Sequence, residues 1–157
     1  MSRKYKPYFN HKTILVLTIR KAQLKDMDWV NAQYQQINFQ LSDIQHELIV
    51  IAKVDGERAG LGRLVTINHE TLELGGMYVL ESFRKYGIAR AIVQHLLNQV
   101  QAKTVYCLPF EHLQHFYVSC GFMPVFSTEE VPTKVLQKWE WCNKTYLDKT
   151  LLLVQQV

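Results

Sequence analysis

The chain has 157 residues, 48% of them hydrophobic, which matches the size of one globular domain that needs neither disulfides nor metals to fold. Its three cysteines form no C-x-x-C pair, a pattern that argues against a disulfide framework and against a zinc knuckle. The formal charge of +4 arises at the N-terminus, because residues 1–12 hold four basic side chains and no acid while the remaining 14 basic and 14 acidic residues balance, so a nucleic-acid-binding surface is not indicated.

The chain is interpreted as a basic, solvated tail at residues 1–12 followed by one domain at residues 13–157. No apolar run approaches the roughly 20 residues that span a bilayer, and the N-terminus lacks the apolar block of a signal peptide. We therefore expect a soluble, cytoplasmic protein without a membrane partner.

The first predicted elements of the domain are a strand and a helix. Residues 13–22 are rich in β-branched and aliphatic side chains, which predicts a strand. Residues 25–37 carry apolar side chains at mixed three- and four-residue spacing, with Asp26 and Asp28 in the first turn, which favours a helix. A short second helix is predicted to begin near Ser42, with Ser-Asp as its cap.

A three-stranded meander is predicted next. Apolar strands at residues 48–54 and 59–67 flank Asp55-Gly56, a dipeptide typical of tight hairpin turns. The third strand, at residues 72–80, contains Gly75-Gly76, and glycines inside a strand indicate a bulge or the close approach of another backbone or a ligand.

The second half of the domain alternates helices and short strands. Apolar periodicity and flanking glycine and proline predict helices at residues 87–101, 110–120 and 132–146 and strands at residues 104–108, 122–126 and 151–154. This order indicates a mixed α/β (α+β) sheet with helices on its faces.

The junction at residues 79–91 combines a strand, a sharp turn and a long helix. Such a junction presents unpaired amide groups and the positive end of a helix dipole to an anion, and phosphate is the natural ligand. Gly87 permits an unusual backbone angle and Ala89 is too small to block a close approach. Three cations surround the turn: Arg84, Lys85 and Arg90. The alternative is a structural turn with exposed cations and no ligand.

Arg84, Gly87 and Ala89 fit the pattern Arg/Gln-x-x-Gly-x-Gly/Ala, and the chain further on contains Phe116-Tyr117-x-x-Cys120-Gly121-Phe122. In both motifs the sequence resembles the GNAT acetyltransferase superfamily, and the resemblance extends from about Thr13 to the C-terminus. It departs from the family pattern at Glu81, where proline is common, at Lys85, where glycine is common, and at Phe110, where many members have an asparagine.

The resemblance implies the GNAT acyl-CoA N-acyltransferase fold, a mostly antiparallel sheet of about seven strands that splay between the fourth and the fifth. It also implies acetyl-CoA as co-substrate and no metal, so His112 and His115 are interpreted as surface or partly buried side chains. The strand would pair with the pantetheine arm and the loop would hold the pyrophosphate, through Met77, Val79, Arg84, Lys85, Tyr86, Gly87, Ile88, Ala89 and Arg90.

The resemblance also implies the catalytic residues. Tyr117 occupies the position of the family's general acid, and a hydrogen-bonded phenol is able to protonate a departing thiolate. Glu73 matches the position of a glutamate base in the histone-acetylating branch of the family. Because Leu72 and Leu74 alternate with it, Glu73 lies on the opposite strand face, which is either the active cleft or solvent.

The acceptor is predicted to be a primary amine of a small molecule or a protein. It is expected to meet the region between the first two strands of the domain, where Tyr34 and Phe39 line a pocket. The alternative is an acyl-CoA-binding GNAT-fold sensor or interaction module without catalysis. Splayed strands leave an open sheet edge that supports dimers in this family, so a homodimer is an open alternative.

Overall fold

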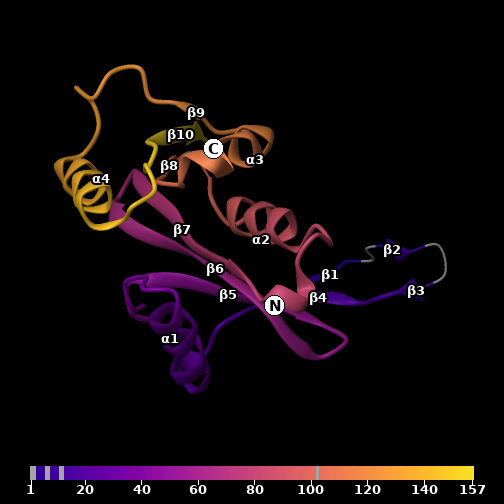
Figure 1. The fold of residues 1–157 in the computed structure, drawn as a ribbon. Coiled ribbons are helices and arrows are strands. Elements are labelled where there is room, and N and C mark those ends of the chain that lie inside the picture. The colour runs from indigo at the N-terminus through magenta and orange to yellow at the C-terminus, as the bar shows by residue number, and fades with distance from the viewer. Residues whose placement is uncertain (1–2, 6–7, 11–12, 102) are drawn as a thin grey trace. The chain divides into compact units, whose positions relative to one another are not determined.

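The computed structural model describes residues 3–5, 8–10, 13–101 and 103–157 (Figure 1). Its strands are β1 (Arg3–Tyr5), β2 (Tyr8–Asn10), β3 (Thr13–Ile14), β4 (Leu17–Lys21), β5 (Glu47–Val54), β6 (Glu57–Asn68), β7 (Thr71–Val79), β8 (Thr104–Cys107), β9 (Met123–Pro124) and β10 (Leu153–Gln156). Its helices are α1 (Met27–Gln36), α2 (Ile88–Leu97), α3 (Gln114–Ser119) and α4 (Thr133–Thr145), with short 3-10 turns η1 (Leu24–Asp26), η2 (Glu81–Phe83) and η3 (Glu111–Leu113).

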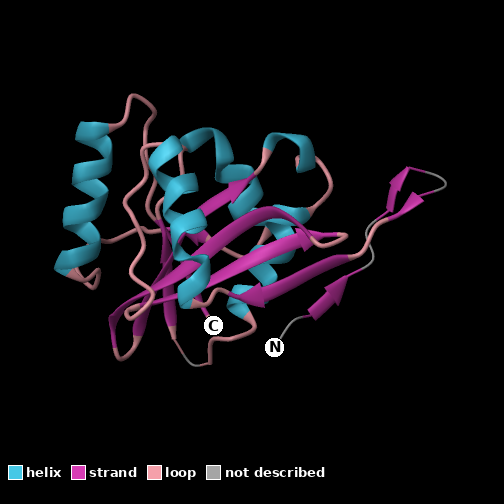
Figure 2. Ribbon diagram, turned by 90° about the horizontal axis from the view of Figure 1, so that it is seen from below, coloured by secondary structure: helices cyan, strands magenta, loops and turns pink. Residues whose placement is uncertain are grey.

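One sheet contains eight strands in the order β1-β4-β5-β6-β7-β8-β10-β9, and β2 and β3 form a separate ladder (Figure 2). The pairs β1-β4, β4-β5, β8-β10 and β9-β10 are antiparallel, whereas β7 and β8 are parallel. The β7-β8 register runs from Thr71↔Thr104 to Leu74↔Cys107, although β7 itself continues to Val79. The predicted mixed sheet is confirmed, and its parallel pair lies where splaying is expected.

The chain divides into two compact units. Unit 1 comprises Met1–Leu64 and Gly76–Asn98, and unit 2 comprises Val65–Gly75 and Gln99–Val157. Strands β6 and β7 therefore contribute residues to both units, whereas α1 and α2 belong to unit 1 and α3 and α4 to unit 2.

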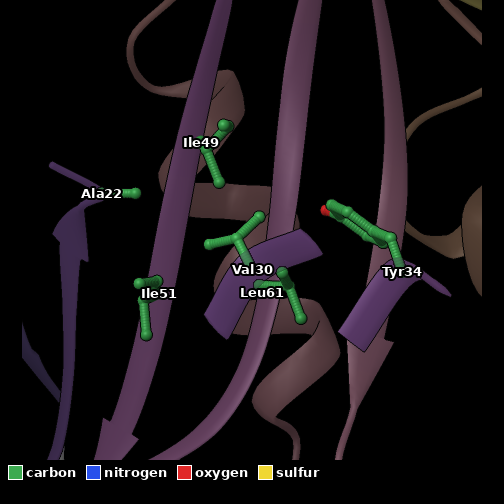
Figure 3. Packing of buried hydrophobic residues seen from close by; sticks show 6 residues of the cluster. All are labelled: Ala22, Val30, Tyr34, Ile49, Ile51 and Leu61. Carbon is green, nitrogen blue, oxygen red and sulfur yellow. The ribbon is translucent and has the colours of Figure 1, made fainter. Parts of the chain in front are cut away.

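Helices cover both faces of strand β6 in unit 1. The α1 side holds a buried cluster (Figure 3) of Ala22, Val30, Tyr34, Ile49, Ile51 and Leu61. Gly60 and Gly62 flank Leu61 and so face the other way, toward α2. A Cβ atom at Gly62 would lie 2.6 Å from the Met77 sulfur and 2.8 Å from Ile92. These glycines allow α2 to approach the sheet closely.

A second core lies in unit 2, where β8 lies between β7 and β10. Tyr106, Val131, Val135 and Leu152 form a buried cluster, so α4 covers the sheet face that carries Tyr106. Because Glu73 is opposite Tyr106 in the parallel register, its side chain shares that face. The predicted helix at residues 132–146 is confirmed, and it covers Glu73.

The N-terminal region differs from the prediction. The strand expected at residues 13–22 is divided, because the Val16 amide donates to the Asp55 carboxylate at 3.0 Å and the β4-β5 pairing ends at that turn. Arg3 pairs with Ile19, so residues 3–5 form strand β1 at the edge of the sheet. Residues 1–2, 6–7 and 11–12 of the predicted tail lie outside the described residues.

The short helix predicted near Ser42 is wrong, since residues 44–46 form only a turn. The Asn31 side chain accepts from the Ser42 amide at 2.7 Å and donates to the Ser42 carbonyl at 3.2 Å. The Asp43 amide donates to the Glu47 carboxylate at 2.7 Å. Side chains from α1 and β5 thus bind backbone groups of Ser42 and Asp43 in a non-helical conformation.

Candidate functional site

The loop at residues 84–89 follows η2 and includes the first two residues of α2, all in unit 1. Lys85 and Gly87 both adopt left-handed backbone angles, with φ of +71° and +78°. Gly87 is the N-cap of α2, and no side chain caps that helix end. A Cβ atom at Gly87 would meet nothing within 4 Å, so the glycine is required by its backbone angle and borders open space. The first amide groups of α2 are therefore presented as an anion site requires.

The loop is tied back to the strand that precedes it. The Arg84 Nε donates to the Val79 carbonyl at 2.9 Å, and the guanidinium carbon lies 5.8 Å from the centre of the Tyr78 ring. Arg84 and Lys85 are exposed, which leaves their charge available to a ligand. The loop therefore combines a fixed backbone with exposed cations.

The other residues predicted to hold the pyrophosphate differ in their exposure. Tyr86 is 38% exposed, and Ala89 and Arg90 are half-buried. Ile88 is 1% exposed, so its side chain belongs to the core and only its main chain is left for a ligand.

Strand β7 is irregular just before Met77. Gly76 has φ of +57°, and its carbonyl accepts a hydrogen bond from the Tyr34 hydroxyl at 2.8 Å. A Cβ atom there would lie 2.5 Å from that hydroxyl oxygen, so no larger residue fits. The irregularity predicted at the paired glycines is confirmed, and it directly precedes the half-buried Met77 and Val79.

Tyr34 and Phe39, the predicted acceptor residues, lie together in unit 1. Their rings stack with centres 6.4 Å apart. Tyr34 is fully buried, and this burial raises the pKa of its phenol above the usual value. Tyr34 is therefore enclosed by protein atoms, whereas Phe39 is half-buried.

Tyr117 lies in unit 2 among aromatic rings and thiols. It is 5% exposed, and its ring lies 4.9 Å from Phe116 and 6.1 Å from Phe122, centre to centre. Burial raises the pKa of the Tyr117 phenol well above its usual value, and interactions with Cys107 and Cys120 raise it further. The phenol therefore keeps its proton, which is the form that a proton donor requires.

Glu73 is held by a lysine from α4. It is 3% exposed, so the alternative of a solvated strand residue is wrong. The Lys138 Nζ donates to its carboxylate at 2.6 Å. Lys138 was not identified from the sequence, although it follows the buried Val135 by three positions and precedes the buried Cys142 by four. A lysine on the apolar row of a helix is the signal that could have indicated a buried acid opposite it.

Phe110 and His112 of η3 take part in local contacts, and His112 and His115 are both exposed. The Phe110 ring lies 6.0 Å from His112, stacked, and 5.4 Å from Tyr146, edge to face. Among the described residues no group of three or more His, Cys, Asp or Glu side chains is arranged to hold a metal ion. None of the helices in the described residues is both long enough and apolar enough to cross a membrane.

Comparison with known proteins gives a family match and several similar folds. Residues 16–122 match the model of the Acetyltransferase (GNAT) family. A search of curated proteins gives no match. A GNAT family acetyltransferase from Elizabethkingia anophelis with acetyl-CoA bound aligns with a TM-score of 0.64 at 15% identity, over 90% of this chain and 98% of that one.

Two further structures are similar at comparable identity. Ribosomal-protein-S18-alanine N-acetyltransferase from Escherichia coli aligns with a TM-score of 0.66 at 13% identity, over 90% of this chain and 94% of that one. N-acetylglutamate synthase from Neisseria gonorrhoeae, in complex with coenzyme A and N-acetyl-glutamate, aligns with a TM-score of 0.70 at 16% identity. That alignment covers 89% of this chain and 35% of the synthase, so this chain spans about a third of the synthase.

Proposed function

Because the chain belongs to the Acetyltransferase (GNAT) family, we propose that it is an N-acetyltransferase. It transfers an acetyl group from acetyl-CoA to a primary amine of a small molecule or protein, by direct attack in a ternary complex. The observation that carries the proposal is the loop at residues 84–89, where two left-handed residues precede an uncapped helix N-terminus beside exposed cations. This arrangement suits a pyrophosphate.

The contacts with the pantetheine arm of acetyl-CoA, the acetyl donor, are assigned to strand β7. Its register with β8 ends at Leu74, and the main-chain groups of Met77 and Val79 follow the irregularity at Gly76. In this proposal those groups pair with the pantetheine arm, and the loop receives the pyrophosphate through the main chain of Gly87, Ile88 and Ala89. Arg84, Lys85, Tyr86 and Arg90 surround it.

The reaction forms a C–N bond to the acetyl carbon and breaks its bond to the sulfur of coenzyme A. The amine must lose a proton and the departing thiolate must gain one. We assign thiolate protonation to Tyr117, whose raised pKa keeps the phenol protonated. We assign the amine proton to Glu73, directly or through water, with Lys138 as its neighbour.

A non-catalytic acyl-CoA-binding module is the second candidate. Two observations favour it: Glu73 is already engaged by Lys138, and Phe110 packs with rings where many family members have an asparagine. Such a module would bind acetyl-CoA through the same loop and release no coenzyme A when amines are added.

Thiol release separates the two candidates. Acetyl-CoA is incubated with the protein and a panel of amino acids, polyamines and lysine-containing peptides, and free coenzyme A is measured with a thiol reagent. We expect amine-dependent release with at least one class of acceptor. Acetyl-CoA binding without release for any amine would favour the module, and absence of binding would remove both candidates.

A further inference from the structure

The most informative group outside the proposed donor loop is a buried arginine on β6. We propose that Arg63 is a positioning residue that couples the acyl-CoA strand β7 to residues 38–46. This segment follows α1 and contains Phe39, one of the predicted acceptor residues. The inference rests on the proposed function, because it assumes that coenzyme A binds along β7.

Arg63 donates hydrogen bonds to the segment of residues 38–46. It is 4% exposed, and its Nη1 donates to the Gln40 carbonyl at 3.0 Å and to the Ser42 hydroxyl at 2.5 Å. Its charge is offset by Glu47, whose carboxylate oxygen lies 3.9 Å away. The same segment has only turns as secondary structure, so these contacts and the Asn31 bonds to Ser42 fix its course.

Arg63 also contacts the irregular part of β7. Its guanidinium carbon lies 4.4 Å from the centre of the Tyr34 ring, and the Tyr34 hydroxyl donates to the Gly76 carbonyl. A Cβ atom at Gly76 would stand 2.8 Å from the Arg63 Nε. One guanidinium therefore touches both the acceptor-side segment and the point where β7 bends toward Met77.

The Arg63 Nε group makes this contact sensitive to a ligand on β7. It is buried and has no hydrogen-bond partner. An unpaired buried donor is unfavourable, so a small shift of the Gly76 region that offers it an oxygen is favoured. When coenzyme A pairs with the main chain of β7, such a shift is transmitted through the rigid, planar guanidinium to Gln40 and Ser42.

The same contacts argue against Arg63 as an anion-binding residue. Glu47 already offsets its charge, and Nη1 already has two protein acceptors. The Nε group faces Gly76, where a Cβ atom would stand 2.8 Å from it, so it is directed at the protein's own backbone. A positioning role is what remains.

Hydrogen exchange measured by mass spectrometry, with coenzyme A as the probe, tests the coupling. In the wild-type protein, coenzyme A is expected to slow exchange in peptides covering residues 80–92 and, through Arg63, in peptides covering residues 38–46. Arg63→Met should keep the first effect within about twofold and reduce the second at least about fivefold. The readout is the change caused by coenzyme A, which a purely structural role would not alter selectively.

Arg58 provides the matched control. It lies on the same strand, its guanidinium carbon is 4.8 Å from the centre of the Trp29 ring of α1, and it pairs with an acid, Asp26, at 3.2 Å. Arg58→Met therefore removes a similar stacked cation without touching residues 38–46, and both effects of coenzyme A should persist. If Arg63→Met does not fold, Arg63→Lys and Tyr34→Phe provide the same comparison with smaller changes.

The outcomes distinguish a failure of this inference from a failure of the proposed function. Protection of residues 80–92 without protection of residues 38–46 in the wild type would overturn the coupling and leave the donor site intact. Equal protection of residues 38–46 in wild type and Arg63→Met would also overturn it. Absence of protection at residues 80–92 would instead remove the proposed function.

Discussion

The loop at residues 84–89 and the surroundings of Tyr117 and Glu73 differ in how far their charged and polar groups are exposed to solvent. Residues 84–87 of the loop are exposed, Lys85 and Gly87 within it have left-handed backbone angles, and no side chain caps the helix that begins there. Tyr117 and Glu73 are 5% and 3% exposed, one among rings and thiols and the other in an ion pair. The first region leaves its charged side chains exposed to solvent, whereas the ionisable groups of the second region are buried.

In the proposed function, this difference assigns donor binding to the first region and chemistry to the second. An exposed anion loop contributes binding through backbone groups that need no partner in the free protein. Buried ionisable groups contribute chemistry, because burial and neighbours determine when they gain or lose a proton. Substitutions should therefore affect donor affinity in the first region and turnover or stability in the second.

The largest expected effect is on turnover. Tyr117→Phe removes one hydroxyl and should lower kcat by about 10³-fold, because the thiolate loses its proton donor. Acetyl-CoA affinity should change less than about twofold, since the donor loop is untouched. Tyr106→Phe, also a buried tyrosine of unit 2 with a raised pKa, is the control and should keep its kcat. A Tyr117→Phe enzyme as fast as the wild type would refute the assignment.

The ion pair beneath α4 should give the next largest effect. Lys138→Met should lower the free energy of unfolding by about 3 kcal/mol, because it leaves the buried Glu73 carboxylate without its partner. Glu73→Gln should cost less, because the Lys138 side chain is 26% exposed and remains partly solvated. The double variant should lose less than the sum. Urea denaturation checks these values.

Activity measurements on the same variants separate the base from the ion pair. We expect kcat to fall more than about tenfold only in variants without the Glu73 carboxylate. An equal loss of kcat in Lys138→Met would mean that the intact pair, and not the Glu73 base, is what catalysis requires.

A smaller effect, on stability alone, is expected in unit 1. Asp26 accepts from Arg20 at 2.8 and 2.9 Å and from the Gln23 amide at 2.8 Å, and the Arg20 bonds, mainly, hold its pKa well below the usual value. A folded-state pKa below the unfolded value of about 3.9 stabilises the folded protein at higher pH. This contribution is lost as the pH falls from the unfolded-state pKa through the lower folded-state pKa.

Asp26→Asn should therefore lower the free energy of unfolding by about 2 kcal/mol at pH 7, with a difference from wild type that shrinks below about pH 4. Thermal unfolding at several pH values measures this. Acetyl-CoA affinity should be unchanged at pH 7, and a parallel loss of affinity would mean that the donor loop depends on this distant acid.

The same contrast explains what the sequence could and could not reveal. The donor loop is local: Gly87, its helix and the preceding cations are adjacent in the chain, and Asp55-Gly56 and Gly76 were likewise recognised from their own residue types. The loop's backbone angles follow from those residues with little help from tertiary contacts.

The Glu73–Lys138 ion pair and the Arg63 hydrogen bonds to residues 38–46 join residues that are far apart in the sequence. Glu73 and Lys138 are 65 positions apart, and Arg63 and Ser42 are 21 apart. Ser42 looks like a helix cap, but Asn31 takes both of its backbone groups. Such outcomes require knowledge of which elements meet, although Arg63 in a buried strand was a signal present in the sequence.

Titration calorimetry with acetyl-CoA tests the central claim, that residues 84–89 form the donor site. Gly56 is the matched control for Gly87, since both have left-handed angles, +86° and +78°, and neither would bring a Cβ atom within 4 Å of another atom. Wild type and Gly56→Val should bind with equal affinity, and Gly87→Val should bind at least about 100-fold more weakly, or ~2.7 kcal/mol. Equal affinity of Gly87→Val and wild type would contradict the account.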